Sequence, residues 1–275
     1  MKDLRTYGEP PFSVAVIHGG PGARGEMATV ARELASAWGI LEPLQTETSV
    51  GGQIEELKGV LEDNGDLPVS LIGFSWGAWL SFLLAAHYPM FVEKLILVGC
   101  GPFEQKYAAE IRETRLKRLS DEEKAEVRSL LEFLNHSGDQ GRQRALRRFG
   151  TLCSKADACD PLIVDSNETE DTEIQIDIYQ GVWTEAAELR RSGKLLAFAK
   201  NISCPVTAIH GDYDPHPAEG VRKPLSAVLD NFRFILLRNC GHMPWIERRA
   251  RDEFYRILKG ELQGSQQERE NENRN

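Results

Sequence analysis

The chain has 275 residues, of which 41% are hydrophobic and 27% charged, and its formal net charge is -9. This length and composition fit one large soluble α/β domain, or such a domain with a modest insertion. The acidic balance argues against nucleic acid or an anionic membrane as the main partner.

Signals for export and for disulfides are missing from the sequence. No apolar run reaches the roughly 18 residues needed to cross a bilayer, and the polar segment Met1 to Pro11 does not resemble a signal peptide. The five cysteines have no C-x-x-C spacing, which indicates reduced thiols. We therefore expect a cytoplasmic protein that does not contact the membrane.

In the first hundred residues, short apolar runs alternate with amphipathic stretches. Continuous apolar runs are typical of strands that are buried on both faces of a parallel sheet. The pattern predicts strands over residues 12–18, 40–44, 68–73 and 94–99, and helices over residues 26–38, 49–62 and 76–88.

The pattern changes to helical signals without a convincing strand between residues 103 and 201. Ser120 and Glu123 fit a capping box, which predicts a helix to about residue 135. Further helices are expected over residues 142–153 and near residues 174–191, with an acidic loop at 161–173. Strands then return at residues 205–210 and 232–237, followed by a helix over 246–258.

This order predicts an α/β fold, with a mostly parallel sheet of six strands and helices on both faces. The predicted core comprises residues 1–102 and 202–262, with an inserted helical cap at 103–201. The polar residues 263–275 are expected to be disordered. Right-handed crossovers place the C-terminal ends of parallel strands at one edge, which is where ligands bind.

Gly73 to Gly77 read Gly-Phe-Ser-Trp-Gly, a G-x-S-x-G pattern between a predicted strand and a predicted helix. Such a turn exposes the serine hydroxyl, and the glycines allow strand and helix to approach closely. The helix that begins at Trp76 would direct its N-terminal N–H groups at negative charge formed beside Ser75. Ser75 is therefore the candidate nucleophile.

A glycine-rich turn, His18-Gly19-Gly20-Pro21-Gly22, follows the first predicted strand. Acyl transfer requires fixed backbone N–H groups that stabilise the oxyanion of the tetrahedral intermediate. Gly20 is the candidate donor, together with the backbone N–H of Trp76. His18 is interpreted as a residue that stabilises the turn.

The last two predicted strands are each followed by a candidate catalytic residue. Asp212 and Asp214 both qualify by position as the carboxylate that orients a histidine. His242 follows the final strand, so the order is Ser, Asp, His, as in this type of architecture. A metal site made of Asp212, Asp214 and His216 is the alternative, but one flexible D-x-D-x-H segment is weak evidence, and we expect no metal.

With these segments in place, the chain resembles the α/β-hydrolase superfamily over about residues 12–102 and 202–262. The resemblance rests on HGGPG, GFSWGAW, HGDYDP and CGH, and HGGPG with Ser-Trp-Gly is similar to the prolyl iminopeptidase branch. It implies Ser75 as nucleophile, His242 as general base and Asp214 as acid, three residues after Gly211. Because superfamily members commonly begin with two further strands, it also implies a truncated N-terminal edge of the sheet.

The expected function is hydrolysis of a small ester or amide by a Ser-His-Asp acyl-enzyme mechanism, without any cofactor. Gly19 and Trp183 are expected to contact the small-molecule substrate. The acidic residues from Asp165 to Asp177 are interpreted as a solvated loop rather than a site for a substrate amine. A prolyl iminopeptidase-type aminopeptidase, a C–C bond hydrolase and a non-catalytic small-molecule receptor remain as alternatives, and the oligomeric state stays open.

Overall fold

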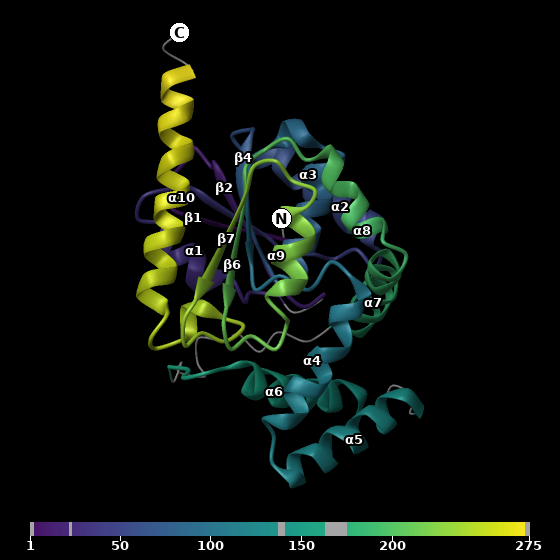
Figure 1. Ribbon diagram of the computed structural model, residues 1–275. Coiled ribbons are helices and arrows are strands. Elements are labelled where there is room, and N and C mark those ends of the chain that lie inside the picture. Colours follow the sequence, from purple (N-terminus) through teal and green to yellow (C-terminus); the bar gives the residue numbers. More distant parts are fainter. Residues whose placement is uncertain (1–2, 22–23, 137–140, 163–174, 273–275) are drawn as a thin grey trace.

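The structure is a computed structural model that describes residues 3–21, 24–136, 141–162 and 175–272 (Figure 1). These residues contain a seven-stranded sheet with the order β1-β3-β2-β4-β5-β6-β7. All neighbouring strands are parallel apart from β1 and β3, which are antiparallel. The strands are β1 Leu4–Tyr7, β2 Val14–Ile17, β3 Ile40–Pro43, β4 Val69–Phe74, β5 Val92–Val98, β6 Val206–Gly211 and β7 Phe232–Leu237.

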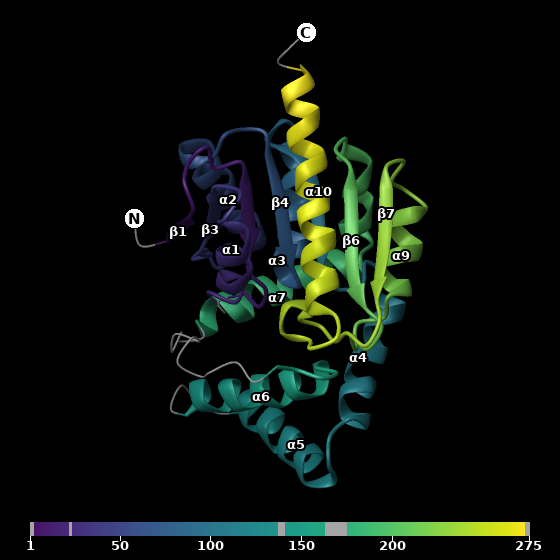
Figure 2. The ribbon, with the colours of Figure 1, turned by 90° about the vertical axis from the view of Figure 1, so that its left-hand side faces the viewer.

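Helices cover both faces of the sheet. Helices α1 and α10 pack on one face, and α2, α3, α7, α8 and α9 pack on the other (Figure 2). The helices are α1 Ala28–Leu34, α2 Val50–Asn64, α3 Trp76–His87, α4 Gln105–Lys117, α5 Asp121–His136, α6 Arg142–Asp157, α7 Ile176–Arg191, α8 Lys194–Ala197, α9 Glu219–Ser226 and α10 Arg251–Glu272.

Side chains of the central strands enter apolar clusters on both faces of the sheet. In β2, Val14 and Val16 pack in the cluster with α1 and α10, whereas Ala15 and Ile17 pack in the cluster with α2 and α3. Successive side chains point to opposite faces, so a strand buried on both faces must be apolar throughout. This confirms the predicted α/β fold, and each of the six predicted strands is present.

The sequence analysis missed a seventh strand, β1, which forms the antiparallel edge of the sheet. Only Leu4 and Tyr7 of its four residues are large and apolar, and β1 is not fully buried. An edge strand faces the protein on one side only, so it lacks the continuous apolar run that marks the inner strands. One strand, not two, therefore precedes β2 among the described residues, in keeping with the expected truncated edge.

Helices α4, α5 and α6 lie beyond the C-terminal ends of the strands (Figures 1 and 2). They have a small apolar cluster of their own, which includes Leu119, Val127 and Leu152. The predicted capping box is present at the start of α5, because Ser120 N–H donates to the Glu123 carboxylate and Glu123 N–H donates to Ser120 Oγ.

Within the predicted cap segment, helix α7 packs differently from α4, α5 and α6. Its residues Ile178, Val182 and Ala186 are buried in the same cluster as α2, α3 and the sheet. At Gly181, an added Cβ would lie only 2.1 Å from the carbonyl oxygen of Thr48, so α7 touches the backbone before α2. Packing therefore favours a cap built of α4–α6, with α7 and α8 belonging to the core; the core–cap division is a proposal.

The C-terminal segment differs from the expectation of disorder. Helix α10 continues to Glu272, beginning on the sheet with Phe254, Leu258 and Leu262 buried. Glutamate, glutamine and arginine dominate the sequence after residue 264, and all three favour helix once an anchored helix precedes them. Residues 273–275 lie outside the described part of the chain. None of the described helices is both long and apolar enough to span a bilayer.

Candidate active site

Ser75 occupies a strained turn between strand β4 and helix α3. Its φ angle is 53°, a left-handed conformation that is uncommon for a residue other than glycine. The turn is fixed because Ser75 N–H donates to the carbonyl oxygen of Val98 at 2.9 Å. Gly77 lets α3 lie against β2, since an added Cβ would lie 2.3 Å from the Ile17 carbonyl oxygen. This is the sharp turn that the G-x-S-x-G pattern predicts.

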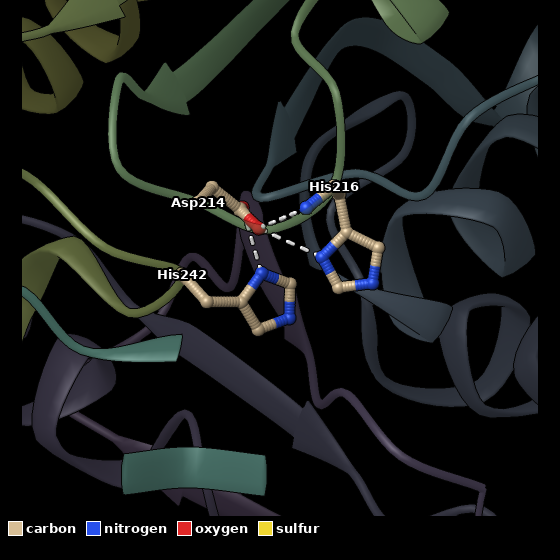
Figure 3. A group of neighbouring side chains, drawn as sticks. All are labelled: Asp214, His216 and His242. Atoms are coloured by element: carbon tan, nitrogen blue, oxygen red, sulfur yellow. Dashed lines mark hydrogen bonds and ion pairs between the residues drawn. The ribbon is translucent and has the colours of Figure 1, made fainter. Parts of the chain in front are cut away.

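Asp214 follows β6, His242 follows β7, and their side chains meet. His242 Nδ1 lies 2.8 Å from Asp214 Oδ2 (Figure 3). The carboxylate of Asp212 is occupied elsewhere, because it accepts Cys240 N–H at 3.3 Å and lies 3.7 Å from Arg238. Of the two aspartates that the sequence left open, Asp214 is the one that contacts His242.

The contact between Asp214 and His242 changes the pKa of both. Burial alone would lower the pKa of His242, but the attraction and hydrogen bond of Asp214 outweigh it and raise that pKa above 6.5. Burial would raise the pKa of Asp214, but the attraction of His242, His216 and His210 holds it well below 3.8. Asp214 is therefore ionised and stabilises a positive charge on His242.

Asp214 has a second histidine partner, His216, which the sequence analysis considered only as a metal ligand. His216 Nδ1 lies 2.7 Å from Asp214 Oδ1, and the backbone N–H of His216 donates to the same oxygen at 2.9 Å (Figure 3). Its ring stacks on His242 with 4.4 Å between centroids. Burial lowers the pKa of His216 to about 4, despite the opposing attraction of Asp214. A neutral His216 thus donates to Asp214 and holds it in place.

The same three residues have the composition of a small metal site. One ligand atom from each of Asp214, His216 and His242 lies within 4.8 Å of the others. Both Nδ1 atoms already face the Asp214 carboxylate at hydrogen-bond distance, and with Asp214 ionised each Nδ1 carries a proton. The donor set is therefore satisfied by its own hydrogen bonds and fits a proton-transfer site better than a cation site.

A cavity of about 230 Å³ lies between the sheet edge and the cap. Ser75, His242, Gly20 and Trp183 all line it. Gly19 is not among the lining residues, because the side chains of Phe74 and Glu26 lie against it, and its contact with substrate stays a prediction. The walls are mostly apolar and include Leu146, Phe149, Tyr179, Met243 and Ile246.

Of the two candidate oxyanion donors, Trp76 directly follows Ser75, and Gly20 lines the same cavity as Ser75. Trp76 is the first residue of α3, so its backbone N–H has no acceptor within the helix. Gly20 has a φ angle of 25°. His18 supports its turn, because Nδ1–H donates to the Gly19 carbonyl oxygen at 2.8 Å and burial lowers the pKa of His18 to about 4. This agrees with the interpretation of His18 as a turn-stabilising residue.

Two of the charged side chains in the cavity form an ion pair. Arg115 of α4 makes two hydrogen bonds to Asp157 of α6, at 2.7 and 2.6 Å. The backbone carbonyl of Asp157 also accepts the N–H of His242 at 2.9 Å. The cap is therefore bonded to the loop that carries the histidine.

Glu247 strengthens the same connection between cap and core. Its buried carboxylate accepts the backbone N–H groups of Gly241, Cys159 and Asp160, at 2.8–2.9 Å. Gly241 is next to His242, whereas Cys159 and Asp160 follow α6. One carboxylate thus holds the histidine loop and the end of the cap together.

Glu26, just before α1, is a third charged residue in the cavity. Its Oε2 atom is shielded from solvent and has no hydrogen-bond partner among the described residues. Burial raises the pKa of Glu26 to about 7, against the lowering effects of His242 and of a backbone hydrogen bond from Gly19.

Sequence reasoning missed Glu26, Arg115, Asp157 and Glu247. It considered His216 only as a metal ligand and not as a neighbour of Asp214 and His242. Position after a strand could have drawn attention to Glu26 and His216, which lie in the segments that follow β2 and β6. Arg115 and Asp157 lie in helices whose sequences show no chemical pattern. Most of the acidic segment from Asp165 to Asp177 lies outside the described residues.

Comparison with known proteins agrees with this architecture. Similar solved structures include VinJ (TM-score 0.74, 19% identity, covering 95% of this chain and 94% of that one). MenH from S. aureus has a TM-score of 0.64 and 18% identity, covering 97% of this chain and 100% of that one. A thermophilic esterase from Thermogutta terrifontis has a TM-score of 0.63 and 16% identity, covering 95% and 93%. At these identities the likeness shows the fold.

The search of curated proteins finds no match for this chain. The family model described as "Alpha/beta hydrolase family" matches residues 3–257. This match confirms the predicted superfamily and the predicted hydrolase class of enzyme, whereas the narrower likeness to prolyl iminopeptidases stays a prediction. The chain belongs to the alpha/beta hydrolase family.

Proposed function

We propose that this protein is a serine hydrolase that cleaves a small ester or amide through an acyl-enzyme intermediate. Ser75 is the nucleophile, His242 the general base, and Asp214 the carboxylate that orients His242. The observation that carries the proposal is the shared cavity: a strained Ser75 and an Asp214-bound His242 line the same 230 Å³ space.

The first half of the reaction transfers the acyl group to the enzyme. His242 Nε2 takes the proton of Ser75 as Oγ attacks the carbonyl carbon, and the backbone N–H groups of Gly20 and Trp76 stabilise the oxyanion. The Asp214 carboxylate stabilises the imidazolium that forms. His242 then gives this proton to the leaving alcohol or amine, and Ser75 is left acylated.

The second half repeats these steps with water in place of the serine hydroxyl. His242 takes a proton from water, the hydroxide attacks the acyl carbon, and the carboxylic acid leaves as Ser75 regains its proton. This chemistry needs protein groups and water alone. His216 transfers no proton in this scheme; it acts by donating a hydrogen bond to Asp214.

The cavity supports a small and partly apolar substrate. Its volume of about 230 Å³ is below the range usual for drug-sized ligands. Trp183 contributes one wall, and its ring lies 6.2 Å from that of Trp76, measured between centroids. We therefore propose Trp183 as a residue that contacts the apolar part of the substrate.

Labelling with a fluorophosphonate probe tests the proposal directly. The probe phosphonylates a serine activated by a base and an oxyanion hole, so wild type should be labelled and the Ser75→Ala variant should not. Ser36→Ala, which changes a serine distant from the cavity, is the matched control and should be labelled like wild type. A folded wild-type protein that stays unlabelled would refute the hydrolase mechanism and favour the receptor alternative.

A further inference from the structure

Glu26 is a cavity residue that the proposed mechanism does not use. Among the described residues that line the cavity, the other fixed charges are Arg115 and Asp157, which pair with each other through two hydrogen bonds. Glu26 has no such partner, and its Oε2 atom is buried without a hydrogen bond. Among the described residues, the cavity therefore contains one carboxyl group that has no cationic partner, within mostly apolar walls.

Glu26 lines the cavity next to the glycine turn that carries the proposed oxyanion donor. Its Oε2 atom lies against Gly19, where an added Cβ would be 2.7 Å away. The next residue, Gly20, is the proposed oxyanion donor and lines the cavity with Ser75.

A bare carboxylate at this position would hinder the proposed reaction. Negative charge develops on the carbonyl oxygen in the transition state, and a nearby negative charge of the protein raises its energy. A positive group on the substrate, placed beside the Glu26 carboxyl group, would remove this penalty. The pKa of about 7 agrees with this reasoning, because burial without a cation disfavours the charged form.

We propose that Glu26 binds a protonated amine on the acyl part of the substrate, so that the enzyme prefers aminoacyl esters or amides. This inference rests on the proposed serine hydrolase function. The ammonium group would donate to the Glu26 carboxyl group, which lines the cavity, and the small apolar side chain of the acyl group would face the cavity walls. The specificity then comes from the oxyanion side of the site rather than from the cap.

Two p-nitrophenyl esters that differ in one group test the inference. The alanine ester carries an ammonium group where the isobutyrate ester carries a methyl group. Wild type should hydrolyse the alanine ester with a kcat/KM about 10- to 100-fold higher, the range for one hydrogen bond between charged groups. Glu26→Gln should remove this preference by lowering kcat/KM for the alanine ester far more than kcat/KM for the isobutyrate ester.

Glu33→Gln is the matched control, because it makes the same change on α1 at a residue that pairs with Lys259 outside the cavity. It should keep the wild-type preference. Two diphenyl phosphonates that carry the same ammonium or methyl group give a second comparison. Here the measured quantity is the rate at which each reagent inactivates the enzyme, which does not require turnover. The inference is overturned if wild type shows no preference with either reagent pair, or if Glu26→Gln changes both members equally. Failure of the serine mechanism looks different, since wild type would then react with no fluorophosphonate.

Discussion

The backbone N–H of His242 donates a 2.9 Å hydrogen bond to the carbonyl oxygen of Asp157, the last residue of α6. The side chain of Asp157 is at the same time paired with Arg115 of α4. The proposed general base is thus attached to the cap through its backbone and to the core through Asp214. Changes in the cap should therefore reach the chemistry.

Removing the charge of Arg115 should disturb both stability and activity. Arg115→Met leaves Asp157 buried without its partner, and we expect a loss of about 2–3 kcal/mol in the free energy of unfolding. We expect kcat to fall about 10-fold, because the end of α6 no longer fixes the His242 loop. Urea unfolding and ester hydrolysis measure the two effects.

Arg148→Met is the control for this prediction, because Arg148 makes a similar two-bond pair with Glu126 on the exposed surface of the cap. It should change stability and kcat little. Equal effects of the two variants would show that the connection to His242 has no special importance.

The pH dependence should report the interaction between Asp214 and His242. His242 must be neutral to act as a base, and its pKa is raised above 6.5, so kcat/KM should rise with pH through a value above 6.5. Asp214→Asn removes the charge that favours the imidazolium, which should move this limb to lower pH and lower kcat about 10⁴-fold. His216, with a pKa of about 4, is neutral throughout this range.

The assay for the pH prediction is hydrolysis of p-nitrophenyl isobutyrate, which carries no titrating group. Glu26→Gln serves as the control, because the pKa of Glu26, about 7, falls in the same range. The rise of kcat/KM with pH should persist in this variant. A limb that vanishes there would belong to Glu26 and would contradict the assignment to His242.

Glu26 should lower stability at high pH, independently of activity. Its folded pKa of about 7 exceeds its ordinary value of 4.5, so the folded state favours the protonated form. The cost is absent below pH 4.5, grows as the pH rises to 7, and is complete above that. The free energy of unfolding of Glu26→Gln, measured relative to that of wild type, should therefore increase by about 1–3 kcal/mol from pH 4 to pH 8.

Denaturant unfolding at the two pH values measures this gain, with Glu33→Gln as the control that should show no comparable change. The same gain at both pH values would mean that the effect comes from packing. A constant difference of zero would mean that the Glu26 carboxyl is paired or solvated in solution.

Glu247 should be among the most sensitive positions outside the proposed triad. Glu247→Gln replaces an oxygen that accepts backbone N–H groups with an amide that donates, and we expect a loss of about 2–4 kcal/mol in unfolding free energy. The Gly241 and Cys159 N–H groups would lose their charged acceptor. Urea unfolding checks this against Glu253→Gln on the exposed side of α10, which should behave like wild type.

Several features follow from local sequence alone. The alternation of apolar runs and amphipathic segments predicted six strands, because a strand buried on both faces must be continuously apolar. The glycines around Ser75 predicted the sharp turn, because strand and helix backbones come too close there for a Cβ. The capping box at Ser120 also depends only on residues next to one another in the chain.

The tertiary structure decided which side chains meet. The sequence left Asp212 and Asp214 equivalent by position, and the packing of the last two strand ends brings Asp214 to His242. The tertiary structure also brings Glu26 into the cavity with Ser75 and His242. It joins Asp157 to His242, although these two residues are far apart in the chain. Local periodicity encodes which face of an element is buried, but contacts between distant polar residues depend on how the buried faces fit together.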